Sequence, residues 1–262
     1  MSNDIGIKAV EEAPEELYKV ELKADERIDE LQRKGYQIIQ NPKQFCFGMD
    51  AVLLAGFADI RKEASVLDMG TGTGIIPLLL EAREKGSKFI GIDIQEDSID
   101  MAKRSVQLNH LEEKIHIIKA DIKEATQLFP LSSFDVVVTN PPYMSAHAGL
   151  KNPDSAKAIA RHEVHASLDE WIEVASRLVK VGGKFFMVHR PHRLTDIMSA
   201  LDKHELTVKR IKMVHPYVDK EANMVLIEAV RKGKSQVIVE KPLIVYKALN
   251  EYHDEIHDIY GY

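Results

Sequence analysis

Four consecutive residues, Asn140-Pro141-Pro142-Tyr143, follow an apolar run that ends at Thr139 and could hold a planar amino group. The Asn140 side-chain carbonyl and the Pro141 backbone carbonyl can both accept hydrogen bonds from one NH₂ group. Proline has no backbone N–H, so only acceptors are offered at that position. The Tyr143 ring can stack on the ring that bears the amine. This pattern predicts chemistry on a conjugated amine, with adenine N6 as the first choice.

A glycine-rich loop lies upstream, at the end of a predicted strand over residues 65–69. Asp68 precedes glycines at positions 70, 72 and 74, which let a ligand approach the backbone without an intervening side chain. Glycines also form tight turns between strands and helices, so the loop alone leaves a purely structural explanation open. The next two strands end in Asp93 and Asp121. Because ligands bind at the carboxyl ends of strands in such sheets, the three carboxylates together predict a nucleoside-containing cofactor.

Two cofactors compete for this loop, and charge and spacing favour S-adenosylmethionine (SAM) over NAD. The dinucleotide pattern is GxGxxG with a pyrophosphate at the helix N-terminus, whereas Ile75 stands here where the third glycine is required. SAM carries no phosphate, so Asp68 is tolerated beside the loop and can pair with the cationic amino end of the methionine moiety. Asp93 can accept hydrogen bonds from both ribose hydroxyl groups, and Asp121 can accept a hydrogen bond from the adenine amino group.

Strands and helices alternate from residue 65 onward and must position these motifs. The alternation predicts an α/β fold with a mainly parallel sheet and helices on both faces. We expect strands at 65–69, 88–94, 114–120, 134–139, 184–189, 206–214 and 224–230. We expect helices at 74–85, 96–109, a short one ending at 129, 168–179 after a cap at Ser167, and 194–204.

The N-terminal quarter is predicted to form a mobile tail and a small accessory layer. Residues 1–21 are acidic and lack periodicity, as is typical of a tail. Residues 36–40 and 44–47 predict two short strands joined around Asn41-Pro42, and Asp50 is expected to cap a helix over 51–58. The predicted domains are therefore the tail at 1–21, a hairpin and helix packing on the core at 22–64, and the catalytic domain at 65–262.

Composition places the chain in a reducing compartment as one large domain. The 262 residues suffice for a substantial core, and the single cysteine, Cys46, excludes an internal disulfide and fits the cytoplasm. No apolar run approaches the length of a membrane span, and the acidic N-terminus is unlike a signal peptide.

The net charge of −6 is unevenly distributed. Residues 1–140 carry 17 basic and 25 acidic side chains, a balance of −8, and residues 248–262 carry four acidic ones and no basic one. Residues 141–247 carry 18 basic and 12 acidic side chains, a balance of +6. This positive part begins directly after Asn140 and would attract an RNA backbone. A solvated surface explains the same balance equally well.

The motifs together resemble those of class I amino-methyltransferases. The similarity extends to Phe45–Leu54, Ala160–Glu163 and Pro242–Tyr246, and over roughly residues 25–262 the chain resembles the bacterial family that methylates adenine N6 in the anticodon loop of a valine tRNA. The resemblance implies a Rossmann-like, seven-stranded, mainly parallel sheet whose last strand is antiparallel. It also implies a set of residues that hold SAM: Asp68, Gly70, Thr71, Gly72, Gly74, Asp93, Ile94, Asp121 and Asn140.

The expected catalytic residues are Asn140, Pro141 and Tyr143, which would hold the target base. The segment 144–166, which contains Lys151, Lys157 and Arg161, is expected to select the substrate. The family resemblance is weakest there, because such loops vary freely. Residues expected to contact the substrate are Pro142, Lys151, Lys157 and Arg161. An ion pair that stiffens this segment is an alternative explanation of Arg161. We expect no metal, because no histidine or carboxylate spacing matches a metal site, and we expect a monomer.

Two further functions fit parts of the pattern. A glutamine-N5 methyltransferase of release factors uses a similar Asn-Pro-Pro-Tyr motif, and a carboxamide also offers a planar NH₂. That family carries a helical domain before the glycine loop, whereas only 64 residues precede Ser65 here. A DNA adenine methyltransferase would need a separate base-reading domain. A SAM-binding protein without catalysis is opposed by the intact Asp68, Asp93 and Asn140.

Overall fold

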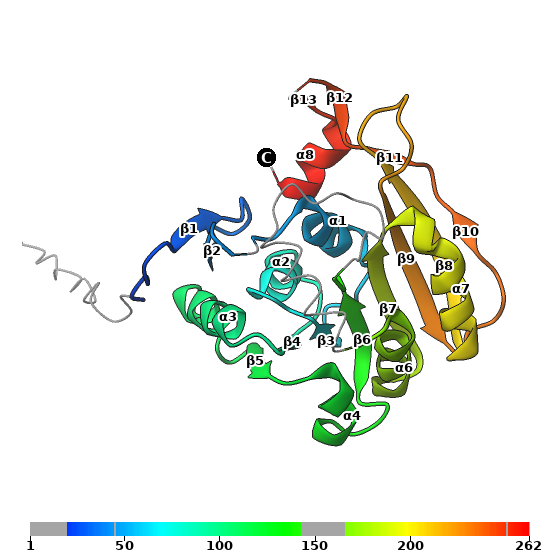
Figure 1. Cartoon of the computed structure of the whole chain (residues 1–262), viewed down its shortest axis with the longest axis horizontal. Coiled ribbons are helices and arrows are strands. Elements are labelled where there is room, and N and C mark those ends of the chain that lie inside the picture. The colour runs from blue at the N-terminus through cyan, green and yellow to red at the C-terminus, as the bar shows by residue number, and fades with distance from the viewer. Residues whose placement is uncertain (1–19, 45, 143–165, 250, 262) are drawn as a thin grey trace, which may run out of the picture.

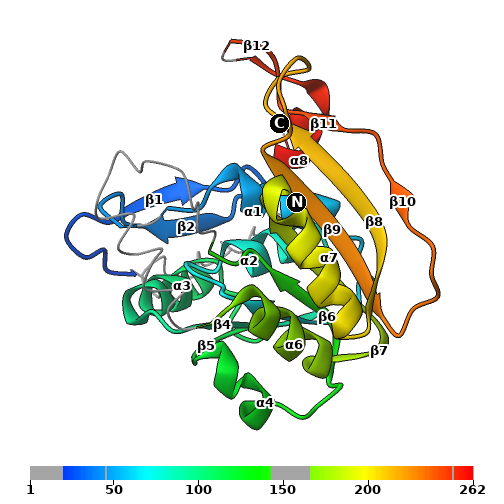
Figure 2. The ribbon, with the colours of Figure 1, turned by 45° about the vertical axis from the view of Figure 1, so that its right-hand side comes forward.

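The computed structural model of the chain describes residues 20–44, 46–142, 166–249 and 251–261. Within these residues, a central twisted sheet is covered by helices on both faces (Figures 1 and 2). Strands and helices alternate along most of the chain, as the sequence predicts. The predicted α/β class is thereby confirmed.

The sheet follows the predicted seven-stranded plan. Its long strands are β3 (Ser65–Met69), β4 (Lys88–Asp93), β5 (Ile115–Lys119), β6 (Phe134–Thr139), β7 (Val179–His189), β8 (Leu206–His215) and β9 (Met224–Arg231). Their spatial order is β5-β4-β3-β6-β7-β9-β8. Five of them pair in parallel, and β9 is antiparallel to both neighbours, β7 and β8. The expectation of an antiparallel last strand is therefore confirmed, and β8 points in the same direction as β7.

Each face of the sheet has its own apolar core. Helices α1 (Met49–Phe57), α2 (Ile75–Ala82) and α3 (Glu96–Leu108) cover one face, and their buried residues form a cluster with Val66, Val138 and Phe186. The short α4 (Ala125–Leu128), α6 (Leu168–Leu178) and α7 (Leu194–Lys203) cover the other face and pack on Leu67 and Phe185. Alternate strand residues thus enter opposite cores, as the pleat of a strand requires.

The N-terminal hairpin differs from the prediction in its partner strand. Strand β2 (Gln37–Gln40) forms as expected, but it pairs with β1 (Arg27–Glu30) rather than with residues 44–47. Lys34 and Gly35 take positive φ values of 50° and 68° and close the hairpin before β2. After β2, Gln44 donates its backbone N–H to the Asn41 carbonyl in a turn, so the chain leaves the hairpin instead of pairing again.

The predicted cap of α1 is also wrong. Gly48 is the N-cap residue and Asp50 lies inside the first turn, where its carboxylate accepts from the Ala51 backbone N–H at 2.9 Å. An acidic side chain in the first turn still favours the positive end of the helix dipole. By contrast, Ser167 caps α6 as predicted, in a reciprocal capping box with Glu170.

The C-terminal part adds elements that the sequence analysis missed. Two short strands, β10 (Ile238–Val239) and β11 (Leu243–Ile244), extend the sheet along β8. A hairpin of β12 (Tyr246–Ala248) and β13 (Glu251–Tyr252) follows, and then helix α8 (Asp254–Tyr260), which lies beside α1 (Figure 1). The hairpin and α8 lie together near the end of β8.

Candidate active site

The glycine loop begins at the carboxyl end of β3, which lies between β4 and β6 in the sheet. Asp68 is fully buried and stands in register with Gly91 of β4 and Val138 of β6. Among the described residues, neither of its carboxylate oxygens has a hydrogen-bond partner, and the buried hydroxyl of Thr71 also has none. A buried carboxylate without a partner is costly, because it loses its hydration and gains nothing in return. Asp68 is therefore a buried carboxylate that no described residue compensates.

Burial raises the pKa of Asp68 to about 7. The nearby Thr71 hydroxyl favours the charged form, although it does not meet hydrogen-bond geometry, and the charge of Asp93 raises the pKa further. A cation placed against Asp68 would reverse this shift by stabilising the carboxylate. The ammonium end of a methionine moiety is a cation of suitable kind, so Asp68 fits the predicted cofactor.

The glycine loop takes backbone conformations that other residues rarely adopt. Gly70, Gly72 and Gly74 have φ values of +75°, +54° and +83°. The backbone N–H groups of Gly70 and Thr71 both donate to the Ile92 carbonyl at 2.9 Å, so the loop is pinned to the end of β4. Left-handed conformations of this kind strain residues that carry a β-carbon, which explains the three glycines.

Asp93 ends β4 next to this loop and is organised differently from Asp68. One of its oxygens accepts from the Gly72 backbone N–H at 3.0 Å, and the other accepts from the Gln95 backbone N–H at 2.9 Å. A carboxylate has about four acceptor sites, so both oxygens keep capacity for a diol. Ile94 follows and is half-buried beside it. This geometry suits the predicted contact with ribose hydroxyls.

The next acidic residue, Asp121, follows β5 by two positions. It is half-buried and caps the short 3₁₀ turn Ile122–Glu124, accepting from the Lys123 backbone N–H at 2.9 Å. The strands β3, β4 and β5 are neighbours in this order, so the three carboxylates lie along one edge of the sheet. The sequence-predicted cofactor residues are therefore brought together.

The end of β6 lies on the other side of β3. The Thr139 hydroxyl donates to the Met69 carbonyl at 2.8 Å and fixes the two strand ends against each other. Asn140 and Pro142 are half-buried, and Pro141 is buried. They follow the end of β6, the strand that pairs with β3, which carries Asp68. Four expected site residues lie outside the described residues: Tyr143, Lys151, Lys157 and Arg161.

Two residues for which the sequence pattern predicts no function adjoin this edge. Trp171 of α6 packs against the glycine loop, so that a β-carbon on Gly70 would come within 2.8 Å of its indole ring. His189 ends β7, the strand beside β6; its burial lowers its pKa to about 4, so the ring is neutral at physiological pH. No local sequence signal indicates that either residue lies at this edge, because their positions depend on strands and loops that are distant in sequence.

Helix α6 also touches the turn that carries Asp121. Glu170 forms an ion pair with Lys123 at 3.1 Å, and its carboxylate completes the capping box at Ser167. The first turn of α6 thus meets both the glycine loop and the Asp121 turn, and it begins two residues after the segment 143–165.

In the described part of the chain, no group of three or more His, Cys, Asp or Glu side chains is placed to hold a metal ion. The expectation of no metal stays a prediction. The helices that the structure describes include none long and apolar enough to cross a membrane.

Comparison with known families shows which proteins the chain is similar to. The family model described as "Methyltransferase domain" matches residues 60–248. A tRNA1(Val) (adenine(37)-N6)-methyltransferase of Porphyromonas gingivalis is 30% identical over 203 residues, which cover 74% of this chain and 78% of the relative. The enzyme of the same name from Phocaeicola vulgatus is 29% identical over 180 residues, covering 69% of this chain and 74% of the relative.

Solved structures show the same fold. A predicted O-methyltransferase of Agrobacterium tumefaciens superposes with a TM-score of 0.64 at 24% identity, covering 81% of this chain and 95% of the other. A ribosomal protein L11 methylase of Lactobacillus delbrueckii gives a TM-score of 0.52 at 18% identity, covering 74% and 84%. The fold and the family match agree, and the chain belongs to the methyltransferase domain family and, within it, to the tRNA1(Val) (adenine(37)-N6)-methyltransferases.

Proposed function

We propose that this protein uses SAM to methylate N6 of an adenine in tRNA, with an adenine of the anticodon loop as its target. The observation that carries the proposal is that Asn140 and Pro141 follow the end of β6, next to the strand that carries Asp68, whose buried carboxylate has no partner among the described residues. The carbonyl groups of Asn140 and Pro141 suit a planar amine, and the carboxylate of Asp68 suits the cationic end of SAM. The names of the relatives, which act on a tRNA adenine, support the choice of substrate.

The cofactor would lie across the carboxyl ends of β3, β4 and β5. Asp68 would bind its amino group, Asp93 its ribose hydroxyls and Asp121 its adenine amino group. The glycine loop, with Thr71 and Ile94, would line the space between these carboxylates. When bound, SAM supplies an electrophilic methyl group on a sulfonium, which leaves as a neutral thioether.

The chain's own contribution to transfer is to prepare the nucleophile. The lone pair of adenine N6 is delocalised into the ring and is a poor nucleophile until the amine turns out of conjugation. The Asn140 side-chain carbonyl and the Pro141 backbone carbonyl would accept hydrogen bonds from the two N6–H groups and orient the lone pair toward the methyl group. They would also stabilise the positive charge that develops on N6. The surplus proton can then pass to water, so no strong general base is required.

Positioning would supply most of the remaining rate enhancement. Holding the two reactants in line is worth roughly 7–11 kcal/mol in favourable cases. We propose that Tyr143 and Pro142 hold the base by stacking and apolar contact, and that Lys151, Lys157 and Arg161 contact the RNA. An unpaired loop base is accessible for this at little cost, unlike a base in a duplex. We further propose that the enzyme acts as a monomer in the cytoplasm.

The proposal is tested with unmodified tRNA transcripts, labelled SAM and mass spectrometry of the nucleosides. We expect N6-methyladenosine in a tRNA with the wild-type protein. Asn140→Ala should lower turnover by about 100-fold or more, the effect typical of removing a preorganised transition-state contact. Calorimetric titration of the same variant should show SAM affinity within a few-fold of wild type.

Two outcomes would overturn the proposal. Near-normal turnover in Asn140→Ala would mean that another group orients the amine. Failure of the wild-type protein to methylate any tRNA, together with methylation of a release-factor glutamine, would assign it to a protein substrate instead.

A further inference from the structure

The carboxyl edge of the sheet carries acidic residues on one side of β6 and a basic turn on the other. The ends of β3, β4 and β5 carry Asp68, Asp93 and Asp121. On the other side of β6, β7 ends at His189 and is followed directly by Arg190-Pro191-His192-Arg193, a turn that contains no acidic residue. A polyanion that reaches Asn140 at the end of β6 therefore has carboxylates on the β3 side and guanidinium groups, which can bind phosphate, on the β7 side.

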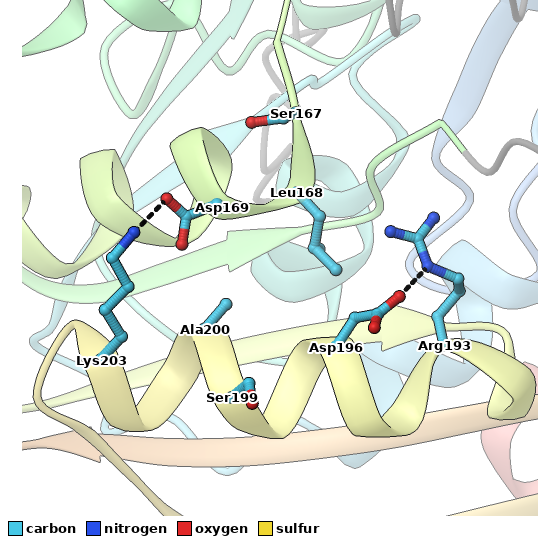
Figure 3. A pocket seen from close by; sticks show the side chains of 8 residues that line it. All are labelled: Ser167, Leu168, Asp169, Arg193, Asp196, Ser199, Ala200 and Lys203. Atoms are coloured by element: carbon cyan, nitrogen blue, oxygen red, sulfur yellow. Dashed lines mark hydrogen bonds and ion pairs between the residues drawn. The ribbon is translucent and has the colours of Figure 1, made fainter.

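Contacts with neighbouring elements hold the two arginines of this turn in place. Arg190 donates through Nη1 to the Asn223 carbonyl at 2.9 Å, which ties the turn to the loop between β8 and β9. Arg193 donates through Nε to Asp196 at 2.7 Å, and its other two guanidinium nitrogens point away from α7 (Figure 3). His192 is exposed between them. Two guanidinium groups held in this way present a fork geometry that matches phosphate.

The α6–α7 cleft behind Arg193 does not itself bind the polyanion. Its volume is about 380 Å³, and Figure 3 shows that its charged lining is already paired, Arg193 with Asp196 and Lys203 with Asp169. The cleft therefore has no net charge to attract a phosphate. Arg193 lines the cleft through its contact with Asp196, and its other two guanidinium nitrogens point away from α7.

A row of aromatic rings continues the edge beyond β9. Tyr217, in the loop after β8, packs on Tyr246 with ring centroids 5.4 Å apart, and Tyr246 stacks on Tyr252 at 5.1 Å. The Tyr246–Tyr252 contact is a cross-strand pair that stabilises the β12–β13 hairpin, and both rings pack on the core. Tyr217 is the end of the row, is half-buried and is not among the rings that pack on the core.

We propose that the RNA strand carrying the target base crosses the ends of β7, β9 and β8, with phosphates on Arg190 and Arg193 and a base stacked on Tyr217. The inference rests on the proposed function and adds the route of the RNA. Neighbouring strands are about 4.8 Å apart, so the path from β6 to β8 is roughly 14 Å, which a few unstacked nucleotides span. Among the described residues, Asp196, Asp219 and Glu221 follow these strand ends; Asp196 and Asp219 are paired with Arg193 and Lys220.

The test measures binding of a fluorescein-labelled anticodon stem–loop RNA by anisotropy over a series of salt concentrations. Arg190→Gln combined with Arg193→Gln should weaken binding at least tenfold and reduce the salt slope by roughly 0.7–0.9 for each lost phosphate contact. Tyr217→Ala should weaken binding by roughly tenfold, whereas Tyr217→Phe, which keeps the ring, should stay within twofold. Affinity for SAM should not change in any of these variants.

A matched control removes the same charge elsewhere. Lys62→Gln combined with Lys232→Gln also deletes two basic groups, each paired with a glutamate as Arg193 is paired with an aspartate. Both lysines lie at the opposite edge of the sheet, before β3 and at the end of β9. This control should bind RNA within twofold of wild type, and thermal melting should show that both double variants fold.

Equal affinities and equal salt slopes for the arginine variant and the lysine control would overturn the inference. Arg193→Lys, which keeps the charge but not the fork, should fall between wild type and Arg193→Gln. Failure of the proposed function gives a different result. Wild-type protein would then form no N6-methyladenosine in tRNA, whether or not it binds the stem–loop.

Discussion

The ends of β3 and β4 carry two buried carboxylates that are in opposite states. Both oxygens of Asp93 have hydrogen-bond partners within the protein, since the backbone N–H groups of Gly72 and Gln95 donate to them. Asp68, on the neighbouring strand, has no hydrogen-bond partner for either oxygen in the part of the chain that the structure describes, and burial raises its pKa to about 7. The same residue type, at neighbouring strand ends, thus serves two different needs.

This difference indicates what each carboxylate contributes. Asp93 is part of the folded loop and offers its remaining lone pairs to hydroxyl groups of a ligand. Asp68 is a buried charge that the protein alone leaves uncompensated, which makes the ligand-free state less stable than it could be. A cationic ligand compensates that charge, so binding and stability should both depend on Asp68 more than on Asp93.

The largest expected effect is the loss of SAM affinity in Asp68→Asn. Removing one partner of a buried ion pair typically costs 3–5 kcal/mol, which corresponds to roughly 100-fold or more in Kd. Isothermal titration with SAM measures it. 5′-Methylthioadenosine, which lacks the amino acid moiety, is the control ligand, and its affinity should not change. An equal loss for both ligands would mean that Asp68 supports the loop rather than the ammonium group.

The second expected effect is on the stability of the ligand-free protein as a function of pH. A carboxyl group whose folded-state pKa exceeds its ordinary value binds more protons when folded, so its contribution falls as pH rises. For Asp68 the window lies between the ordinary value of 3.8 and about 7, and the difference corresponds to roughly 4 kcal/mol. Urea unfolding at pH 5 and pH 7.5 should show Asp68→Asn gaining stability relative to wild type at the higher pH. A constant difference between the two proteins would contradict the assigned pKa.

The third effect concerns Asp93 and should separate the two strand ends. Asp93→Ala removes an acceptor from two backbone N–H groups, which costs about 1–3 kcal/mol in stability for each one left buried and unsatisfied. SAM affinity should fall at least tenfold. Unlike Asp68→Asn, this variant should weaken binding of 5′-methylthioadenosine to the same degree as binding of SAM, because the ribose is common to both ligands. Unchanged affinity for both would remove the assignment of Asp93 to the ribose.

The carboxylates at these strand ends could be predicted because short apolar strands place their first polar residue at the sheet edge. Ser65–Met69 and Phe134–Thr139 have the predicted bounds, and the acidic residues and Asn140 follow from them. The different states of Asp68 and Asp93 could not be predicted. They depend on which backbone N–H groups the loop turns toward each carboxylate, and that depends on the three-dimensional path of residues 70–74.

Elements with few apolar contacts of their own were also missed. Arg27–Glu30 pairs with β2 although its sequence, RIDE, carries little strand signal, because Arg104 and Glu26 anchor that segment to α3 at 2.6 Å. Helix α8 contributes Ile256 to the core and Ile259 against Gly56, contacts too sparse to give a helical period. In both cases tertiary partners decide the structure and local propensity does not.

The smallest expected effect compares the glycines that accompany the two carboxylates. A β-carbon on Gly72 meets no atom within 4 Å, so Gly72→Ala should cost only the backbone strain of its φ of +54°, about 1 kcal/mol. Gly70→Ala has the same kind of strain and also a 2.8 Å contact with Trp171, so it should cost clearly more in urea unfolding. The open space beside Gly72 has no occupant within the described residues, which makes it the place where a ligand would approach the backbone. Gly72→Ala should therefore lower SAM affinity by more than its small loss of stability accounts for. If affinity and stability fell in proportion, Gly72 would be required by the turn alone, and the ligand would pass closer to Asp68.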